Sequence, residues 1–282
     1  MKNCRVLVVL VVGALGLLVA AAQGADGSGK VVRYARFEVG GSVAYGIVEG
    51  DRVRKLSGVL FGTWAKTDTT YALADVKLLA PTQPTKVLAL AGNYKSHVGD
   101  RAPSKAPEVF FKVPSALLAP GGAIVIPKAT QNVHYEAELV IVIGKRARNV
   151  PADKALDYVL GVTCGNDVSA RDWQKNDVQW WRAKGSDTFG PCGPVIASGL
   201  DYDNLLLQLR LNGQVKQRQR TRDMVHGVAE TVSWISRHVT LEPGDLIFTG
   251  TMGKTSAMKP GDVVEVELEG VGILKNRVVS AP

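Results

Sequence analysis

The segment H-Y-E-A-E-L-V-I-V-I-G, residues 134–144, places two carboxylates inside an apolar run. Glu136 and Glu138 are two residues apart, so in a β-strand their side chains project from the same face, together with His134. That face continues into Val140 and Val142, and the opposite face is also apolar, which indicates a strand buried on both sides. Neighbouring carboxylates in such a setting lose hydration and repel one another. A divalent cation held by oxygen ligands would relieve both effects, so the segment predicts a metal site.

A second run with the same spacing serves as a comparison. V-V-E-V-E-L-E-G, residues 263–270, alternates apolar residues with three glutamates, Glu265, Glu267 and Glu269. This alternation is typical of a half-buried antiparallel strand whose polar face meets solvent. The spacing alone therefore does not predict a metal site. The prediction depends on the burial of both strand faces around Glu136 and Glu138.

A third carboxylate would help to neutralise and orient a divalent ion. The buried strand pattern D-Y-V-L-G-V-T-C-G-N-D ends at Asp167, where the chain enters a turn. Asp167 is thus a candidate ligand. The alternative interpretation is an ordinary helix cap or turn residue.

The elements that must position these residues are mostly strands. Residues 31–80 contain short strand and turn patterns and predict a small N-terminal β subdomain, which ends at A-P-T-Q-P-T. Further strands follow from residue 85 to the C-terminus at 282, with one clear helical periodicity over 223–238. Strands do not alternate regularly with helices, so a doubly wound sheet is not expected. The pattern predicts an α+β, mostly β fold.

Six blocks in this chain, in this order, resemble the fumarylacetoacetate hydrolase family. They are G-N-Y-K-S-H, H-Y-E-A-E-L-V-I-V-I-G, N-D-V-S-A-R-D-W-Q, R-A-K-G-S-D-T-F-G-P-C-G-P, L-E-P-G-D-L-I-F-T-G-T and G-D-V-V-E-V-E-L-E-G-V-G. The resemblance covers residues 85–282, the implied catalytic domain, and less strongly the subdomain at 31–80. It implies a mixed β-sandwich roll, a homodimer, and Mg²⁺ (or Mn²⁺ or Ca²⁺) held by Glu136, Glu138 and Asp167.

The same resemblance implies roles for residues around the ion. His97 matches the family's general base, and Asp100, where relatives usually carry Glu, matches the residue that orients it. Lys184 matches a lysine that faces the bound substrate. Substrate contacts are implied for four further residues, Tyr94, Arg171, Gln174 and Thr251. The loop T-G-T-M-G-K-T departs from the family's T-G-T-P-x-G-V-G, which leaves the shape of the substrate pocket there open. Trp173, Trp180 and Trp181 are expected to pack rather than to contact substrate.

The resemblance favours a metal-dependent hydrolase or lyase that cleaves a C–C bond in a small 2-oxo acid of 1,3-dioxo, acylpyruvate type. One alternative is an isomerase or decarboxylase of an unsaturated 2-oxo diacid, or an oxaloacetate decarboxylase, because these reactions use the same enolate. An alternative of another class is a periplasmic protein that binds oxo acids without turnover. The His97–Asp100 pair argues against the last, since binding alone needs no base.

The N-terminus has the pattern of a secretory signal peptide. Lys2 and Arg5 precede an uncharged apolar run, which ends in small residues at Ala20–Ala22. Cleavage after residue 22 predicts a periplasmic or secreted protein without stable membrane association. An uncleaved N-terminal membrane anchor is the alternative, although the run is slightly shorter than the roughly 18 residues of a comfortable span.

Composition limits the remaining classes. The formal charge of the 282-residue chain is +8, or +6 without Lys2 and Arg5 (8 − 2). The basic residues are scattered apart from K-Q-R-Q-R-T-R at 216–222, which has no interleaved aromatics. This stretch is interpreted as a solvated edge strand or as a charge that attracts small anionic substrates, so no nucleic-acid partner is expected. G-K-T at 253–255 lacks the glycine that a Walker loop needs at 248. Cys164 and Cys192 could form one disulfide or remain two buried thiols.

Overall fold

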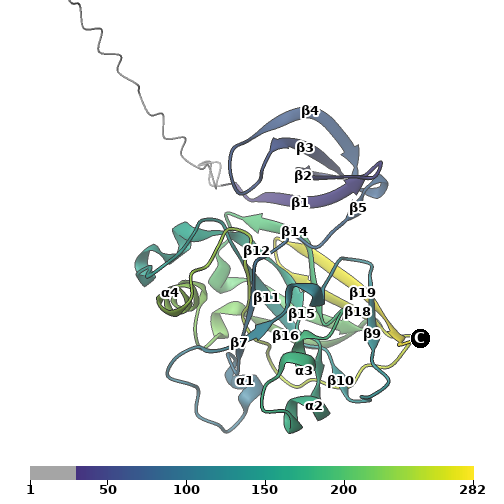
Figure 1. Ribbon diagram of the computed structural model, residues 1–282, viewed down its shortest axis with the longest axis vertical. Coiled ribbons are helices and arrows are strands. Elements are labelled where there is room, and N and C mark those ends of the chain that lie inside the picture. The colour runs from purple at the N-terminus through teal and green to yellow at the C-terminus, as the bar shows by residue number, and fades with distance from the viewer. Residues whose placement is uncertain (1–29) are drawn as a thin grey trace, which may run out of the picture.

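The computed structural model describes residues 30–282, and strands dominate it (Figure 1). The strands are β1 (Val32–Val39), β2 (Ser42–Glu49), β3 (Arg52–Gly58), β4 (Trp64–Ala72), β5 (Lys77–Leu78), β6 (Val87–Ala91), β7 (Glu108–Lys112), β8 (Leu117–Leu118), β9 (Ala123–Ile126), β10 (Val133–His134), β11 (Ala137–Ile143), β12 (Val159–Asn166), β13 (Ser169–Ala170), β14 (Gly190–Ser198), β15 (Leu206–Leu211), β16 (Gln214–Arg220), β17 (Leu246–Phe248), β18 (Val263–Leu268) and β19 (Gly272–Ser280). The α-helices are α1 (Lys95–Val98), α2 (Arg171–Asn176), α3 (Trp181–Gly185) and α4 (Val228–His238). Short 3-10 helices are η1 (Leu73–Asp75), η2 (Pro114–Ala116), η3 (Ala152–Tyr158), η4 (Tyr202–Asn204) and η5 (Thr221–Asp223). The predicted α+β, mostly β class is confirmed. The predicted signal peptide at 1–22 lies outside the described residues and stays a prediction.

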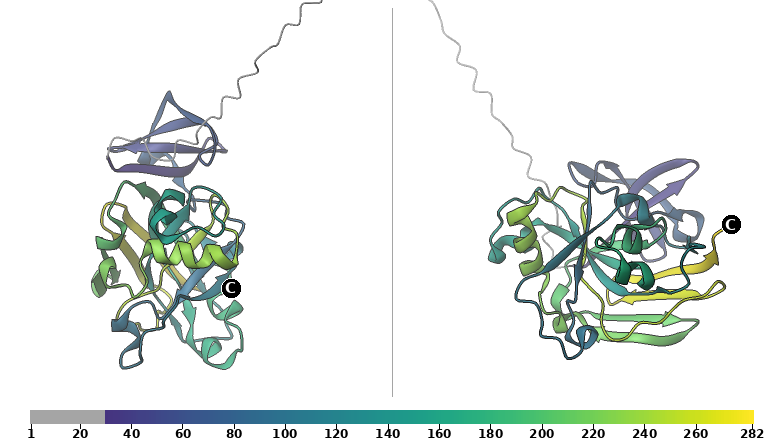
Figure 2. Two further views of the ribbon diagram at one scale, coloured as in Figure 1. Left: turned by 90° about the vertical axis from the view of Figure 1, so that its left-hand side faces the viewer. Right: turned by 60° about the horizontal axis from the view of Figure 1, so that its bottom comes forward.

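The largest sheet joins the N-terminal strands to the rest of the molecule. Its strand order within residues 30–282 is β4-β3-β2-β1-β14-β12-β11-β17-β6-β7, with β5 on β1 and β8 on β14. β1 runs antiparallel to β14, with Val32 opposite Ser198 and Tyr34 opposite Ile196. Figures 1 and 2 show β1–β4 as a curled layer beside the main body, next to β14. The small N-terminal subdomain is thus an extension of the central sheet.

A second sheet, in the order β16-β15-β18-β19-β9, covers one face of the central strands. The side chains of β11 alternate between two core clusters. Leu139 and Ile141 join the cluster that contains β15 and β18, whereas Val140 and Val142 pack with Phe248 on the other side. Each fully buried side chain of this kind stabilises the fold by about 1.5–3 kcal/mol. β11 is therefore buried on both faces, as predicted, and a carboxylate on it is held away from bulk water.

The helix predicted over 223–238 is shorter than expected. Residues 224–227 are not helical, with extended backbone at Met224 and Gly227, and α4 begins only after Gly227. This segment is held by Asn93, whose side-chain oxygen accepts the backbone N–H of His226 at 2.8 Å and whose amide donates to the His226 carbonyl at 3.0 Å. Tertiary hydrogen bonds thus override the helical periodicity at this end.

The two cysteines of the described chain are separate buried thiols. Cys164 on β12 and Cys192 on β14 belong to the two different core clusters, on opposite faces of the central sheet. Side chains on opposite faces cannot be bridged, and the disulfide alternative is therefore wrong.

Within residues 30–282, no helix is both long and apolar enough to cross a membrane.

Candidate active site

Three carboxylates meet where β11 begins and β12 ends. In the antiparallel ladder Ala137 lies opposite Asn166, which brings Glu136, just before β11, beside Asp167, just after β12. The Asp167 N–H donates to the Glu136 carbonyl at 2.9 Å, and the Glu136 N–H donates to the Asn166 side chain at 2.8 Å. One oxygen from each of Glu136, Glu138 and Asp167 lies within 4.8 Å of the others. The strand register thus gathers the three predicted ligands, all at most 3% exposed.

Cations surround two of these carboxylates. Lys184 Nζ, at the end of α3, donates to Glu136 Oε2 and to Asp167 Oδ2, both at 2.6 Å. Arg171, the first residue of α2, pairs with Glu136 Oε1. Burial by itself would raise the pKa of Glu136, but Lys184 and Arg171 overcome it and lower the pKa to about 2. Glu136 is therefore held ionised.

Glu138 is in the opposite situation. Burial, and then the neighbouring charges of Asp167 and Glu136, raise the pKa of Glu138 well above its usual value. Among residues 30–282, its one hydrogen bond comes from the N–H of Gly250, which donates to Oε2 at 2.7 Å, and no side-chain cation pairs with it there. A buried carboxylate next to two others in this situation is the place where a divalent ion fits. The all-oxygen donor set suits a hard ion such as Mg²⁺ or Mn²⁺.

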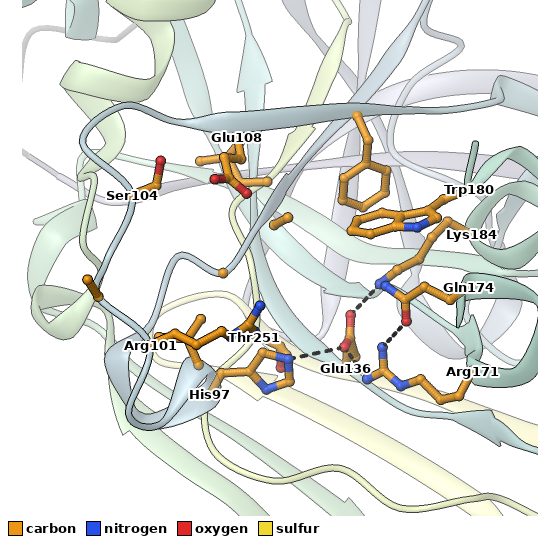
Figure 3. A pocket seen from close by; sticks show the side chains of 16 residues that line it. His97, Arg101, Ser104, Glu108, Glu136, Arg171, Gln174, Trp180, Lys184 and Thr251 are labelled. Carbon is orange, nitrogen blue, oxygen red and sulfur yellow. Dashed lines mark hydrogen bonds and ion pairs between the residues drawn. The ribbon is translucent and has the colours of Figure 1, made fainter. Parts of the chain in front are cut away.

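His97 lies across the site from the two cations, as Figure 3 shows. Its Nδ1 donates to the carbonyl oxygen of Gly253 at 2.7 Å, because a carbonyl can only accept. Its Nε2 faces Glu136 Oε1 at 3.7 Å. The Gly253 carbonyl therefore selects the tautomer that leaves Nε2 free to take a proton.

The structure does not bring Asp100 to His97. Helix α1 ends at Val98, and Gly99 turns the chain with a φ of +65°, so the helical i, i+3 geometry does not extend to Asp100. Asp100 is exposed and makes no hydrogen bond or ion pair within residues 30–282. The orienting contact expected from Asp100 is instead made by the backbone of the loop at Gly253.

A cavity of about 340 Å³ opens over the carboxylates. His97, Lys184, Arg171, Gln174 and Thr251 all line it, together with Glu136 (Figure 3). Arg171 donates to the Gln174 side-chain oxygen at 2.7 Å, which fixes both side chains at one wall. Trp180 lines the cavity as well, with its ring edge-on to Phe110 at 5.3 Å. Trp180 thus packs as expected and also borders the cavity.

Tyr94 is placed differently from the other predicted substrate contacts. It is fully buried and does not line the cavity. Its hydroxyl has no hydrogen-bond partner among the described residues, and burial, followed by the charge of Glu138, raises its pKa. Tyr94 thus lies behind the carboxylates rather than beside a substrate.

The loop with the unusual sequence T-G-T-M-G-K-T forms one side of the site. Besides the Gly250 N–H and the Gly253 carbonyl, it supplies the Thr255 hydroxyl, which accepts from Arg171 at 3.0 Å and lies 2.8 Å from His134 Nδ1. The second ring nitrogen of His134 lies 2.8 Å from the Asn132 side-chain oxygen. Both nitrogens of His134 are thus engaged, and it supports the loop rather than facing the carboxylates.

Two residues that support the site were not predicted from the sequence. Lys112 on β7 donates to Asp167 Oδ1 at 2.7 Å. Gln217 on β16 accepts the N–H of Ala137 at 3.0 Å and donates to the Thr251 hydroxyl at 2.9 Å. The solvated-strand interpretation of 216–222 is therefore wrong at Gln217, which is buried. A polar residue on the inward face of an alternating strand is the signal that could have revealed either one.

Comparison with known proteins places this chain in a family. Residues 86–279 match the family model described as "Fumarylacetoacetate (FAA) hydrolase C-terminal", and residues 32–81 match "Rv2993c-like, N-terminal". The crystal structure of 2-hydroxyhepta-2,4-diene-1,7-dioate isomerase from Mycobacterium marinum is 42% identical, with a TM-score of 0.82 over 88% of this chain and 98% of that one. Oxaloacetate tautomerase FAHD2A, mitochondrial, from Bos taurus is 40% identical over 221 residues, 73% of this chain and 70% of that protein.

A solved structure with lower identity contains a metal ion. Maleylpyruvate hydrolase from Sphingobium sp. SYK-6, in complex with manganese (II) ion and pyruvate, is 28% identical with a TM-score of 0.74, over 89% of this chain and 100% of that one. The family match covers more than half of the chain and includes every predicted site residue. The protein belongs to the fumarylacetoacetate hydrolase family and is an enzyme of that family.

Proposed function

We propose that this enzyme, with a divalent ion, interconverts small 2-oxo acids by moving a proton at the carbon next to the keto group, as an isomerase or tautomerase. The observation that carries the proposal is the arrangement of one imidazole and two cations around a single carboxylate. His97 Nε2 faces Glu136 Oε1 at 3.7 Å, while Lys184 and Arg171 contact the same carboxylate from the other side. The isomerase and tautomerase names of relatives that are 42% and 40% identical support this form of the reaction.

Glu136, Glu138 and Asp167 would hold Mg²⁺ or Mn²⁺, with Ca²⁺ as a further possibility. A bound ion of this kind supplies Lewis-acid polarisation of the substrate's keto and carboxylate oxygens.

Arg171 and Gln174 would bind the substrate carboxylate. Arg171 is already oriented by its contacts with Gln174 and Thr255, so little side-chain entropy remains to be lost on binding. Lys184 is held as a cation, since Asp167 and Glu136 raise its pKa although burial acts to lower it. Its ammonium would stabilise the negative charge that develops on the substrate oxygen when the proton leaves.

His97 would take the proton from the carbon at Nε2 and return it to a carbon or oxygen of the same intermediate. Protonation makes the ring an imidazolium, which Glu136 Oε1 stabilises on one side while Nδ1–H stays bound to the Gly253 carbonyl. A positioned general base of this kind typically contributes about 10²–10⁴-fold to the rate.

C–C hydrolysis of an acylpyruvate is the second candidate. There His97 would take the proton from an attacking water, and the same enolate would leave. The similarity to maleylpyruvate hydrolase, at 28% identity, favours this reaction. It was the first hypothesis from the sequence, and the isomerase alternative is now preferred because of the higher identity of the relatives named for it.

Proton NMR in D₂O separates the two reactions. Purified protein with Mg²⁺ or Mn²⁺ is incubated with a panel of 2-oxo acids that contains oxaloacetate, unsaturated 2-oxo diacids and acylpyruvates. Metal-dependent exchange or migration of the proton at C3, with the carbon skeleton intact, is the expected result. Release of pyruvate and a second acid from an acylpyruvate would replace the proposal by hydrolysis. If no member of the panel undergoes either reaction, both candidate functions are contradicted.

The enzyme is further proposed to form a homodimer and to be exported. Three side chains on the edge strand β7 or next to it, Val109, Phe111 and Val113, are exposed and apolar, and a second copy of the chain would cover such a surface. Light scattering coupled to size-exclusion chromatography tests the dimer.

N-terminal sequencing of protein from its native host tests whether the mature chain starts near residue 23 in a periplasmic or secreted fraction.

A further inference from the structure

Lys112 makes contacts that only a buried ammonium can make. Its side chain is 0% exposed, and its Nζ has three oxygen acceptors around it. These are Asp167 Oδ1 at 2.7 Å, the Phe189 carbonyl at 3.1 Å and the carbonyl of Lys184. A lysine ammonium has three N–H donors and no acceptor, so all of its hydrogen-bonding capacity is used.

This arrangement keeps Oδ1 of Asp167 bound to the ammonium of Lys112. Lys112 is enclosed, so its ammonium cannot turn to solvent when the site changes. The other oxygen, Oδ2, contacts Lys184, whose side chain lines the open cavity. Asp167 therefore offers a single oxygen, Oδ2, to the centre of the carboxylate cluster.

Glu138 is restricted in the same way by backbone. Its Oε2 accepts the Gly250 N–H at 2.7 Å, and the backbone at Gly250 is closely packed, because a Cβ there would lie 2.8 Å from the Cβ of Asn93. Oε1 of Glu138 is thus the oxygen with no hydrogen-bond donor among the described residues, and the one most open to a ligand. Two of the three carboxylates are thus built to act through one oxygen each.

We propose that Lys112 makes the metal site discriminate between divalent ions, favouring Mg²⁺ and Mn²⁺ over Ca²⁺ by keeping Asp167 monodentate. Ca²⁺ takes roughly six to eight oxygens at about 2.3–2.6 Å and commonly uses bidentate carboxylates, whereas Mg²⁺ takes an octahedral set at about 2.0–2.1 Å. A site that withholds the second oxygens of Asp167 and Glu138 removes ligands that Ca²⁺ needs and that Mg²⁺ does not. The inference rests on the metal site of the proposed function.

The chain contains a matched control for Lys112. Lys86 also pairs through its Nζ with a fully buried aspartate, Asp245, and that aspartate accepts further hydrogen bonds from Thr85. Neither Lys86 nor Asp245 lines the cavity. The Lys86 side chain is 20% exposed, so Lys86→Met removes a partly buried lysine–aspartate contact without touching the carboxylate cluster.

The test measures the dissociation constants of Mn²⁺, Mg²⁺ and Ca²⁺ by calorimetry on the full chain, for the wild type, Lys112→Met and Lys86→Met. The wild type is expected to bind Mn²⁺ and Mg²⁺ more tightly than Ca²⁺. In Lys112→Met the ratio of the Ca²⁺ to the Mn²⁺ dissociation constant should fall by about tenfold, within the range typical for partners of metal ligands. Lys86→Met should leave that ratio unchanged.

Three results would overturn the inference. One is a wild type that binds Ca²⁺ as tightly as Mn²⁺, and this measurement stands even if Lys112→Met does not fold. Another is a folded Lys112→Met, verified by circular dichroism, with an unchanged ratio; the metal site would then remain and only the role of Lys112 would be lost. The third is an equal change in Lys86→Met. A wild type that binds none of the ions contradicts the proposed function itself, which separates the two failures.

Discussion

The imidazole of His97 donates its Nδ1–H to the carbonyl oxygen of Gly253 at 2.7 Å, across 156 residues of sequence. A backbone carbonyl accepts only, so this one contact determines which nitrogen carries the proton. It leaves Nε2 directed at the carboxylate cluster. The unusual loop T-G-T-M-G-K-T thus performs the task that the sequence suggested for Asp100.

Replacing His97 should separate catalysis from metal binding. His97→Gln should lower turnover by about 10²–10⁴-fold, the usual contribution of a general base, while the Mn²⁺ dissociation constant stays the same. Asp100→Asn is the comparison and should leave turnover nearly unchanged, since Asp100 does not contact His97. A loss in Asp100→Asn as large as that in His97→Gln would mean that Asp100 reaches the histidine when substrate is bound.

Removal of any one predicted ligand should weaken metal binding. Glu136→Gln, Glu138→Gln and Asp167→Asn each delete a charge from a buried three-carboxylate cluster, so calorimetric Mn²⁺ affinity should fall by more than the roughly 10–100-fold seen for residues that only support ligands. Glu265→Gln is the control, because Glu265 belongs to a glutamate pair with the same spacing on β18. Undiminished Mn²⁺ binding in the Glu136→Gln, Glu138→Gln double variant would remove the site assignment.

Gln217 should matter for stability although it lies in a strongly polar strand. Gln217→Leu leaves the buried N–H of Ala137 without its acceptor, which should lower the free energy of unfolding by about 1–3 kcal/mol. The adjacent Arg218 is exposed, so Arg218→Leu should change it by no more than about 0.5 kcal/mol. Urea denaturation compares the two, and equal effects would show that Gln217 has no special role.

Acid should reveal the contribution of Arg210. Its guanidinium donates to Glu265 at 3.1 Å and to Glu267 at 2.7 Å, and these hydrogen bonds hold the pKa of both carboxyls below the usual range. A carboxyl whose pKa is lower in the folded state adds stability above its unfolded pKa, and that stability is lost as the pH falls through the folded value. The free energy of unfolding of the wild type should therefore exceed that of Arg210→Met by up to about 1 kcal/mol near pH 7, since the pairs are partly exposed. This difference should disappear towards pH 3.

Urea unfolding between pH 3 and pH 7 measures this gap. Arg146→Met is the control, because the Arg146–Glu242 pair is largely exposed and should contribute little at any pH. A gap between wild type and Arg210→Met that widens as the pH falls would contradict the assignment.

The two buried thiols should be unreactive in the folded protein. Burial raises the pKa of Cys164 to about 12 and also raises the pKa of Cys192, so neither forms the reactive thiolate at neutral pH. Alkylation at pH 8 should modify both only after denaturation, as peptide mass spectrometry would show. A Cys164–Cys192 disulfide peptide, or labelling of either residue under native conditions, would be inconsistent with this burial.

The sequence by itself determined the strand pattern, the carboxylate spacing and the family. Side-chain alternation along a strand is a local property, so Glu136 and Glu138 can be assigned to one face without knowledge of any partner. The buried runs on both sides of that strand already indicated that the carboxylates would lie away from water. Asp167 could be named as a candidate from its place at the end of a strand.

Only the tertiary structure decided which residues support that cluster. The ammonium of Lys112 meets Asp167 although 55 residues separate them in sequence and three strands, β11, β17 and β6, separate β12 from β7 in the sheet order. Gln217 reaches Ala137 from the second sheet, and although its place on an inward face is a local signal, its partner is not. The family resemblance assigned Asp100 to His97, but helix α1 ends at Val98 and a positive φ at Gly99 turns the chain away. Spacing predicts neighbours only while an element continues, and contacts between elements depend on strand register and on the path of loops.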